Sequence, residues 1–405
     1  MTDANRQTLL ASLPSSFDTG PDWLRVLRGR AADALREQGL PTKRTEAWRF
    51  TPVRSLVETE FSVDDRGVPS LVSALPDGVS VRHLAEVLEG QPELLQARLD
   101  LGGVPSHFAA LNTALFRDGL WIDVPPDTLA SEPLEISHRI PRSREPGVVY
   151  PRVLVTLGEG AELTLIETYS GTESGQLSNA VVEVDLGRNA KMSHVRVHEN
   201  AGLQVGRVDV RQAADSRYRS TVITLGGALL RFDVRCLLQG KGAQCQLDGA
   251  YLLEGDDHVD HHTLVEHQAS HCQSTQTYRG IVSGKGTAVF DGVVIVHRDA
   301  QKTEAHQENR NLLLSDTATV HTKPHLEIDA DDVICSHGAT VGALDDSQLF
   351  YLRARGVPED LARAMLTYAF LESIVDRVSH DATRARMREA LLARIPYGEE
   401  IRGVT

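Results

Sequence analysis

Apolar residues near the start of the chain recur every three to four positions, which is the spacing of one buried face of an α-helix. The pattern follows Pro21 and Asp22 and ends at Gly39, where a left-handed C-terminal cap is favoured. A second helical segment is expected at about residues 83–99. We therefore predict a mainly helical N-terminal region over residues 1–110. The apolar positions of its first helix are Trp23, Val26, Leu27, Ala31, Ala34 and Leu35.

From about Leu120 to Leu326 the apolar residues alternate with polar ones, and this period of two predicts β-strands. A unit of strand, glycine turn and strand is used several times, at intervals that show no fixed period. The turns of this unit begin at Gly158, Gly187, Gly240 and Gly284.

Two architectures are compatible with such a run of strands, a β-sandwich and a parallel β-helix. The run extends for roughly 200 residues without a convincing helix and is rich in Val, Ile, Leu and Thr, which favours a solenoid of stacked coils. We predict a mainly β fold with helical ends, whose core is a parallel β-helix over residues 111–344.

The remaining residues, 345–405, are expected to form a C-terminal helical domain. Pro358 suits the start of a helix, and Glu359 and Asp360 place negative charge at its N-terminus. A second helix is expected at about residues 383–395. Because these helices are amphipathic and follow a β region with its own core, we expect them to present a partner surface. The apolar positions of the first helix are Leu361, Met365, Tyr368, Leu371, Val375 and Val378.

Composition narrows the classes of function. The 405 residues carry 42 basic and 56 acidic side chains, a net charge of −14, which disfavours a general nucleic-acid binder. Residues 1–20 show no secretory signal pattern, and no apolar stretch approaches the ~20 residues that span a bilayer. The four cysteines form no C-x-x-C pair, so we expect reduced thiols in a cytoplasmic protein. Together, these observations predict a protein without a membrane or nucleic-acid partner.

Histidine is concentrated in one part of the chain. Imidazole and thiolate together suit zinc, copper, iron or an iron–sulfur centre, and Cys272 and Cys335 lie in the same window. The spacings are not those of a zinc finger, so each histidine taken alone is more often structural than a metal ligand. The window contains His258, His261, His262, His267, His271, His297, His306, His321, His325 and His337.

Cys335 and His337 are the candidate metal ligands. Two residues apart on a strand, they would point to the same face and reach one ion together. They follow an acidic stretch and end the β region just before the helical tail. The alternative is a buried thiol and a hydrogen-bonded imidazole at a domain junction.

Other chemistries find little support in the sequence. No phosphate loop, dinucleotide fingerprint or nucleophile elbow is present. Asp256, Asp257 and Asp260 could imitate the acidic cluster of a β-helical polysaccharide lyase, but acidic residues this numerous usually solvate a surface. A carbohydrate-active β-helix enzyme and a self-sufficient β-helical metal-binding protein stay open as alternatives.

Seven segments in the same order resemble the SufB/SufD family of the SUF iron–sulfur cluster assembly system. The first resembles the family's P-x-x-K-x-E-x-W signature, and the sixth contains Cys335 and His337. Members of the SufB type carry Glu at the position of Gly338 and Cys at that of Leu352, so the departures here favour the SufD type. The segments are Pro41–Thr51, Tyr278–Ile281, Asp299–Thr303, Gln307–Leu314, Pro324–Ile328, Asp331–Gly342 and Leu349–Gly356.

The resemblance implies a right-handed parallel β-helix between helical ends and a non-catalytic assembly subunit. It implies a SufB-like paralogue paired along the β-helix and a SufC ATPase on the C-terminal helices, and a homodimer of the isolated chain is compatible with it. His337 would help to form an iron or nascent-cluster site at the paralogue interface, and reduced flavin would belong to the complex, with no cofactor tightly bound to this chain alone. Candidate docking residues for the ATPase are Ala364, Met365, Tyr368, Phe370 and Leu371.

Overall fold

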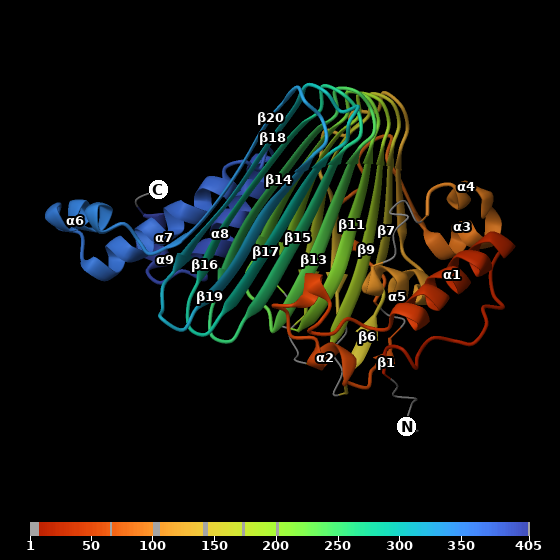
Figure 1. The fold of residues 1–405 in the computed structure, drawn as a ribbon, viewed down its shortest axis with the longest axis horizontal. Coiled ribbons are helices and arrows are strands. Elements are labelled where there is room, and N and C mark those ends of the chain that lie inside the picture. The colour runs from red at the N-terminus through yellow and green to blue at the C-terminus, as the bar shows by residue number, and fades with distance from the viewer. Residues whose placement is uncertain are drawn as a thin grey trace.

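The computed structural model describes residues 8–64, 67–99, 106–140, 145–171, 175–199 and 202–403. Two large sheets face each other in the centre, with helices at both ends of the chain (Figure 1). The predicted mainly β fold with helical ends is confirmed, because the strands build a β-solenoid of about seven turns. None of the described helices is long and apolar enough to cross a membrane.

The N-terminal part contains short helices and three short strands. Its first helix begins after Pro21 and ends at Gly39, whose φ of 71° is the left-handed conformation expected there. The elements are α1 (Asp22–Gln38), η1 (Glu46–Trp48), α2 (Arg54–Val57), β1 (Ser62–Val63), β2 (Ser70–Leu71), β3 (Ser80–His83), α3 (Leu84–Gly90), α4 (Glu93–Gln96) and α5 (His107–Leu115).

The strands of the solenoid alternate between the two sheets. The first sheet runs from β3 through β4 to β19, with β1 and β6 attached at its side. Its solenoid strands are β4 (Leu120–Val124), β6 (Gly147–Val149), β7 (Arg152–Leu157), β9 (Leu177–Leu186), β11 (Leu203–Gln212), β13 (Leu229–Leu238), β15 (His258–His267), β17 (Thr287–Val296) and β19 (Thr319–Ile328).

The second sheet runs from β2 through β5 to β20. All neighbouring solenoid strands in both sheets are parallel; the described antiparallel pairs are β2 with β5 and β3 with β4. Its solenoid strands are β5 (Leu134–Arg139), β8 (Glu162–Ser170), β10 (Lys191–His198), β12 (Arg217–Thr224), β14 (Gln244–Leu253), β16 (Gln273–Val282), β18 (Thr303–Leu313) and β20 (Val333–Gly342).

The coils are more regular than the glycine spacing indicates. Arg207 pairs with Asp233, 26 residues further on, and Asp291 pairs with Lys323, 32 residues further on. The repeat varies from 26 to 32 residues, so the expectation of no fixed period stands. The larger steps between the glycine turns have two causes: the turn between β11 and β12 contains no glycine, and the Gly284 turn leads from the second sheet back to the first, at the opposite edge from the Gly240 turn.

Helices cover the outer faces of both sheets. Leu154 and Leu203 of the first sheet pack with the N-terminal helices. The second sheet is covered by α7 (Glu359–Val375) and α8 (Asp381–Leu392), which bury Val195 and Ile281. These two helices therefore pack on their own β domain. In Figure 1, α6 (Asp346–Ala354) extends away from the solenoid, and α9 (Gly398–Arg402) ends the described chain.

Candidate functional site

The last coil of the solenoid leaves one end open. Both sheets end there, since β19 pairs only with β17 and β20 pairs only with β18 in the strand order of the described residues. The free edges therefore expose a row of backbone donors and acceptors, a ready template for another strand. Large apolar side chains are exposed on the same coil: Ile328, Ile334 and Val341.

Cys335 and His337 both lie on β20, in this last coil. Alternation along the strand gives both side chains the inward direction, because Cys335 pairs with Ala305 and His337 with Gln307, which are both buried. Cys335 is half-buried and packs with Val333 and the small apolar cluster at this end, while His337 is exposed. Burial raises the pKa of the Cys335 thiol, so the thiol form is favoured there.

A buried row of polar side chains leads inward from His337. The register places Gln276, Gln307 and His337 on successive strands of the second sheet. Gln307 Nε2 donates to Gln276 Oε1 at 3.2 Å, and Thr263 Oγ1 donates to the same oxygen at 2.6 Å from the facing sheet. His337 thus lies at the open end of a row of hydrogen-bonded polar side chains inside the solenoid. Sequence spacing alone did not indicate this row.

The described residues contain no group of three or more His, Cys, Asp or Glu side chains that could hold a metal ion. Cys335 and His337 are therefore two donors without a third in this part of the chain. Structural zinc sites typically use about four protein ligands, and iron–sulfur clusters are held by several thiolates. An iron or cluster at this end would need donors from a second surface.

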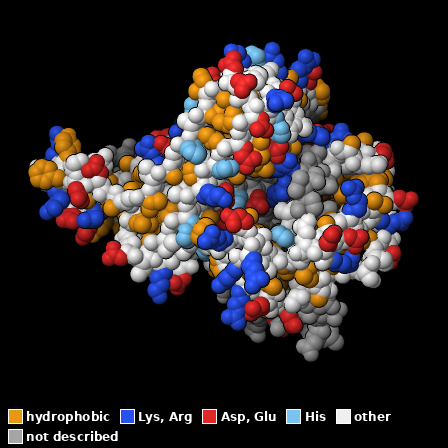
Figure 2. Space-filling model, in the orientation of Figure 1, with side chains coloured by type: hydrophobic (Ala, Val, Ile, Leu, Met, Phe, Trp, Pro, Cys, Tyr) orange, Lys and Arg blue, Asp and Glu red, His pale blue; other side chains and the backbone are white. Residues whose placement is uncertain are grey.

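The other histidines of the predicted window are dispersed over both faces of the strands. His261 and His267 lie in the solenoid interior, where burial lowers the pKa of His261 to about 3 and that of His267 to about 4. A charge from Arg196 adds to the lowering at His261. Figure 2 shows other histidines at the surface over the solenoid strands, interspersed with acidic and basic side chains. These positions do not form one metal centre.

The N-terminal signature segment docks on the outer face of the first sheet. Trp48 lies under the guanidinium of Arg231, with the Arg231 Cζ 4.1 Å from a ring centroid. Thr51 donates a hydrogen bond to Asp260, and Arg231 Nη1 lies 2.7 Å from the same carboxylate. Burial would raise the pKa of Asp260, but the nearby charges of His262 and Arg231 hold it well below its ordinary value.

Asp260 is therefore an anchor for the N-terminal segment. Asp257, by contrast, accepts backbone hydrogen bonds from Gly227 and Glu254 at a turn. The two carboxylates have separate structural roles, so the acidic cluster imagined for a polysaccharide lyase is not assembled. Sequence neighbours could reveal only His262, because the other partners of Asp260 come from residues about 30 and 200 positions away.

The candidate docking residues on α7 differ in exposure. Ala364, Tyr368 and Leu371 are buried against the second sheet, and Met365 and Phe370 are partly buried beside them. These five residues belong to the apolar cluster that joins the C-terminal helices to the second sheet; their role in docking stays a prediction. The exposed apolar surface of this domain lies on α6, where Phe350 is 73% and Tyr351 is 56% exposed. Hydrophobic side chains gather at the tip of this projecting helix in Figure 2.

These features define a class of protein: a parallel β-solenoid with helices on both outer faces and an open, donor-bearing end. The family model described as SUF system FeS cluster assembly, SufBD core domain, matches residues 139–370. The iron–sulfur cluster assembly protein SufD of Escherichia coli K12 is 30% identical over 96% of this chain and 100% of its own length.

Two further relatives agree with this match. A SufBD family protein of Synechocystis is 30% identical over 91% of this chain and 90% of its own. The SufD protein of Bacillus subtilis is 25% identical over 91% of this chain and 93% of its own. The chain belongs to the SufBD family and is of the SufD type, as its sequence motifs predicted.

Proposed function

We propose that the chain is a non-catalytic SufD-type subunit of a SUF iron–sulfur cluster assembly complex in the cytoplasm. The observation that carries this proposal is the open end of the solenoid, where unpaired strand edges and two potential donors occur together in β20. The four cysteines are free thiols, which agrees with a reducing compartment.

The partner at the open end is a SufB-like paralogue with its own β-solenoid. A second solenoid can satisfy the backbone groups of β19 and β20 and cover the exposed Ile334 and Val341. The same surface allows the isolated chain to pair with a second copy of itself. Because strand pairing is not selective by itself, the paralogue is preferred through side chains at the interface.

Iron or a nascent cluster is the cargo of this interface. His337 offers an imidazole nitrogen, and Cys335 offers a weaker donor because its thiol form is favoured. The paralogue would supply the remaining ligands, so cargo could leave when the two surfaces separate. Reduced flavin in the complex stays a prediction from the family resemblance.

A SufC ATPase is expected to dock on the C-terminal helices. The support for this location is the exposed apolar tip of α6, which projects from the solenoid while α7 and α8 are committed to packing (Figure 1). Phe350 and Tyr351 supply aromatic anchors of the kind that dominate protein interfaces. Movement of the ATPase could then be transmitted through α7 to the solenoid.

Co-expression with a SufB-like paralogue and a SufC-like ATPase tests both contacts separately. We expect Ile334→Asp/Val341→Asp to lose the paralogue, since two charges would be buried at the open end. Phe350→Ser/Tyr351→Ser should lose the ATPase and keep the paralogue. Val26→Asp, on the exposed side of α1, is the control and should leave the complex intact.

The outcome that contradicts the proposal is co-purification of both partners at parental ratios with all three variants. A self-sufficient metal-binding protein would instead bring neither partner and would hold iron alone. The readouts are subunit ratios after size-exclusion chromatography and iron content per chain.

A further inference from the structure

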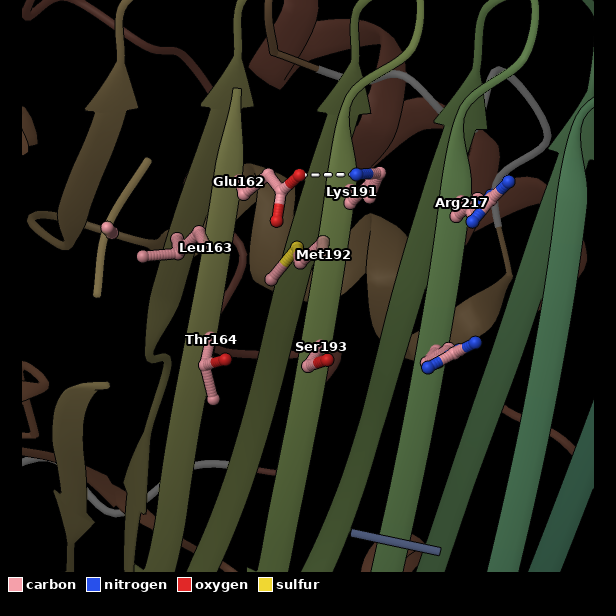
Figure 3. Close-up of a pocket in the computed structure, with 9 residues that line it drawn as sticks. Glu162, Leu163, Thr164, Lys191, Met192, Ser193 and Arg217 are labelled. Atoms are coloured by element: carbon pink, nitrogen blue, oxygen red, sulfur yellow. Dashed lines mark hydrogen bonds and ion pairs between the residues drawn. The ribbon is translucent and has the colours of Figure 1, made fainter. Parts of the chain in front are cut away.

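A basic hollow lies on the outer face of the second sheet, away from the open end (Figure 3). Its volume is about 180 Å³, and the loop between α7 and α8 borders it, where Ser379 Oγ lies 3.5 Å from Ser193 Oγ. The lining residues come from β8, β10 and β12 and one preceding loop: Ala130, Glu162, Leu163, Thr164, Lys191, Met192, Ser193, Arg217 and Arg219.

The parallel register arranges these side chains as a grid. Lys191 pairs with Arg217, and Ser193 pairs with Arg219, on neighbouring strands. Arg217 and Arg219 are two residues apart on β12, so both point outward, roughly 6.6 Å apart along the strand. The short side chains of Thr164 and Ser193 lie among the longer ones in Figure 3, and this difference in length creates the hollow.

The charges of the hollow are only partly neutralised within the described part of the chain. Lys191 is paired with Glu162, the one acidic residue that lines the hollow. The side chains of Arg217 and Arg219 make no hydrogen bond or ion pair to any described residue. Asp248 lies near Arg219, but its carboxylate already accepts from Arg377 at 2.7 Å and from Gln246 at 2.6 Å.

Two free guanidinium groups and two hydroxyl groups around a small hollow form a donor set for a tetrahedral oxyanion. Arginine presents a planar fork of N–H donors that matches phosphate oxygens, and Ser and Thr hydroxyls donate to the remaining ones. The whole chain carries a net charge of −14, so general attraction of anions is disfavoured. Any anion bound here must therefore be held by local contacts.

We propose that this hollow binds a phosphate group, with Arg217 and Arg219 as the principal contacts and Thr164 and Ser193 as hydroxyl donors. The group could belong to free inorganic phosphate or to a nucleotide, because both present the same oxygens. This inference is independent of the proposed assembly function, since the hollow lies on neither the open end nor α6.

Calorimetric titration of the full chain with inorganic phosphate at low ionic strength tests the proposal. We expect saturable binding of one phosphate per chain, and at least about tenfold weaker binding by Arg217→Gln/Arg219→Gln, because two charge-assisted hydrogen-bonding groups are lost. Arg25→Gln/Arg36→Gln on α1 changes the net charge equally and should bind like the parent chain. Thermal unfolding of each variant verifies that it is folded.

Parallel titrations with ATP and AMP distinguish the two sources. Nucleotide binding at least about tenfold tighter than that of phosphate, and lost in the Arg217/Arg219 variant, would assign the group to a nucleotide. Equal affinities for all three would assign a free oxyanion. Absence of saturable binding to the parent chain, or equal affinities of the two double variants, would overturn the proposal.

Discussion

Cys335 and His337 occupy the same face of β20 but different surroundings. Cys335 packs among small apolar residues, while His337 is exposed above the buried Gln307. A strand that ends a solenoid can therefore present one structural and one accessible donor within three residues. This difference makes the two side chains experimentally separable.

We expect His337→Ala to lower the rate of cluster formation in the assembled complex by about tenfold or more, an effect typical of metal-site partners. The complex should still assemble, because His337 is exposed and supports no packing. Cys335→Ala should have a weaker effect. Cluster absorbance measures the rate, and subunit ratios verify assembly.

The control is His325→Ala, an exposed histidine on the neighbouring last strand of the first sheet. It should form clusters at the parental rate. If the His337 variant also did so in an intact complex, His337 would have no part in the site.

Each coil of the solenoid depends on close packing between its strands. Gly280 on β16 shows one of the tightest cases, because a Cβ built there would lie 1.9 Å from the ring of Tyr251. Tyr251 is buried and fixed by hydrogen bonds with Asn309 and Asn311, so its ring cannot move aside easily. The absence of a side chain at this position is thus a packing requirement of the element.

We expect Gly280→Ala to lower the free energy of unfolding by about 1–3 kcal/mol through overpacking. Gly342→Ala is the matched control, since it lies in the last strand of the same sheet with no atom within 4 Å of the added Cβ. Denaturant unfolding of both variants measures the difference. Equal stability of the two would show that Tyr251 can relocate at little cost.

At the scale of the whole molecule, the solenoid interior contains ionisable groups as well as apolar ones. Glu167 lies between His138 and His194, with each imidazole Nε2 2.5 Å from a carboxylate oxygen. Burial would raise the pKa of Glu167, but hydrogen bonds from the two histidines hold it well below its ordinary value. His261, by contrast, is held in its neutral form, because burial and the positive charge of Arg196 lower its pKa to about 3.

These shifts predict that the chain loses stability as the pH falls below about 6.5. Below that pH the unfolded state binds a proton at each histidine, whereas the folded state leaves His261 neutral until about pH 3. From pH 7.5 to 5.5, we expect His261 alone to remove about 1.4 kcal/mol from the free energy of unfolding. Over the same pH range, the free energy of unfolding of His261→Gln should fall by about 1.4 kcal/mol less than that of the parent chain.

Denaturant titrations at the two pH values measure this difference, provided that the dependence on denaturant concentration is the same for both chains. An equal loss in the parent chain and in His261→Gln would mean that His261 binds its proton over the same pH range in the folded and unfolded states.

Local sequence determined part of the elements and their ends; the helix expected at about residues 83–99 is instead divided into α3 and α4. The apolar spacing after Pro21, the conformational freedom of Gly39 and the cap at Pro358 act within a few residues, so the helices they bound were predictable. Alternation along 120–326 likewise identified the strands, and the motif segments identified the family. Neighbouring residues suffice for these features because the forces involved are local.

Tertiary structure alone decided which coil lies beside which. The Gly284 turn belongs to the opposite edge from the Gly240 turn, and Asp260 meets Thr51 from 209 positions away. The basic hollow likewise needs three strands in register before Lys191, Arg217 and Arg219 become neighbours. Such contacts depend on the length of each coil and on the packing of the helices. Neither can be predicted from the sequence of a single strand. The open position of His337 has the same origin, because only the stacking order makes β20 the last strand of its sheet.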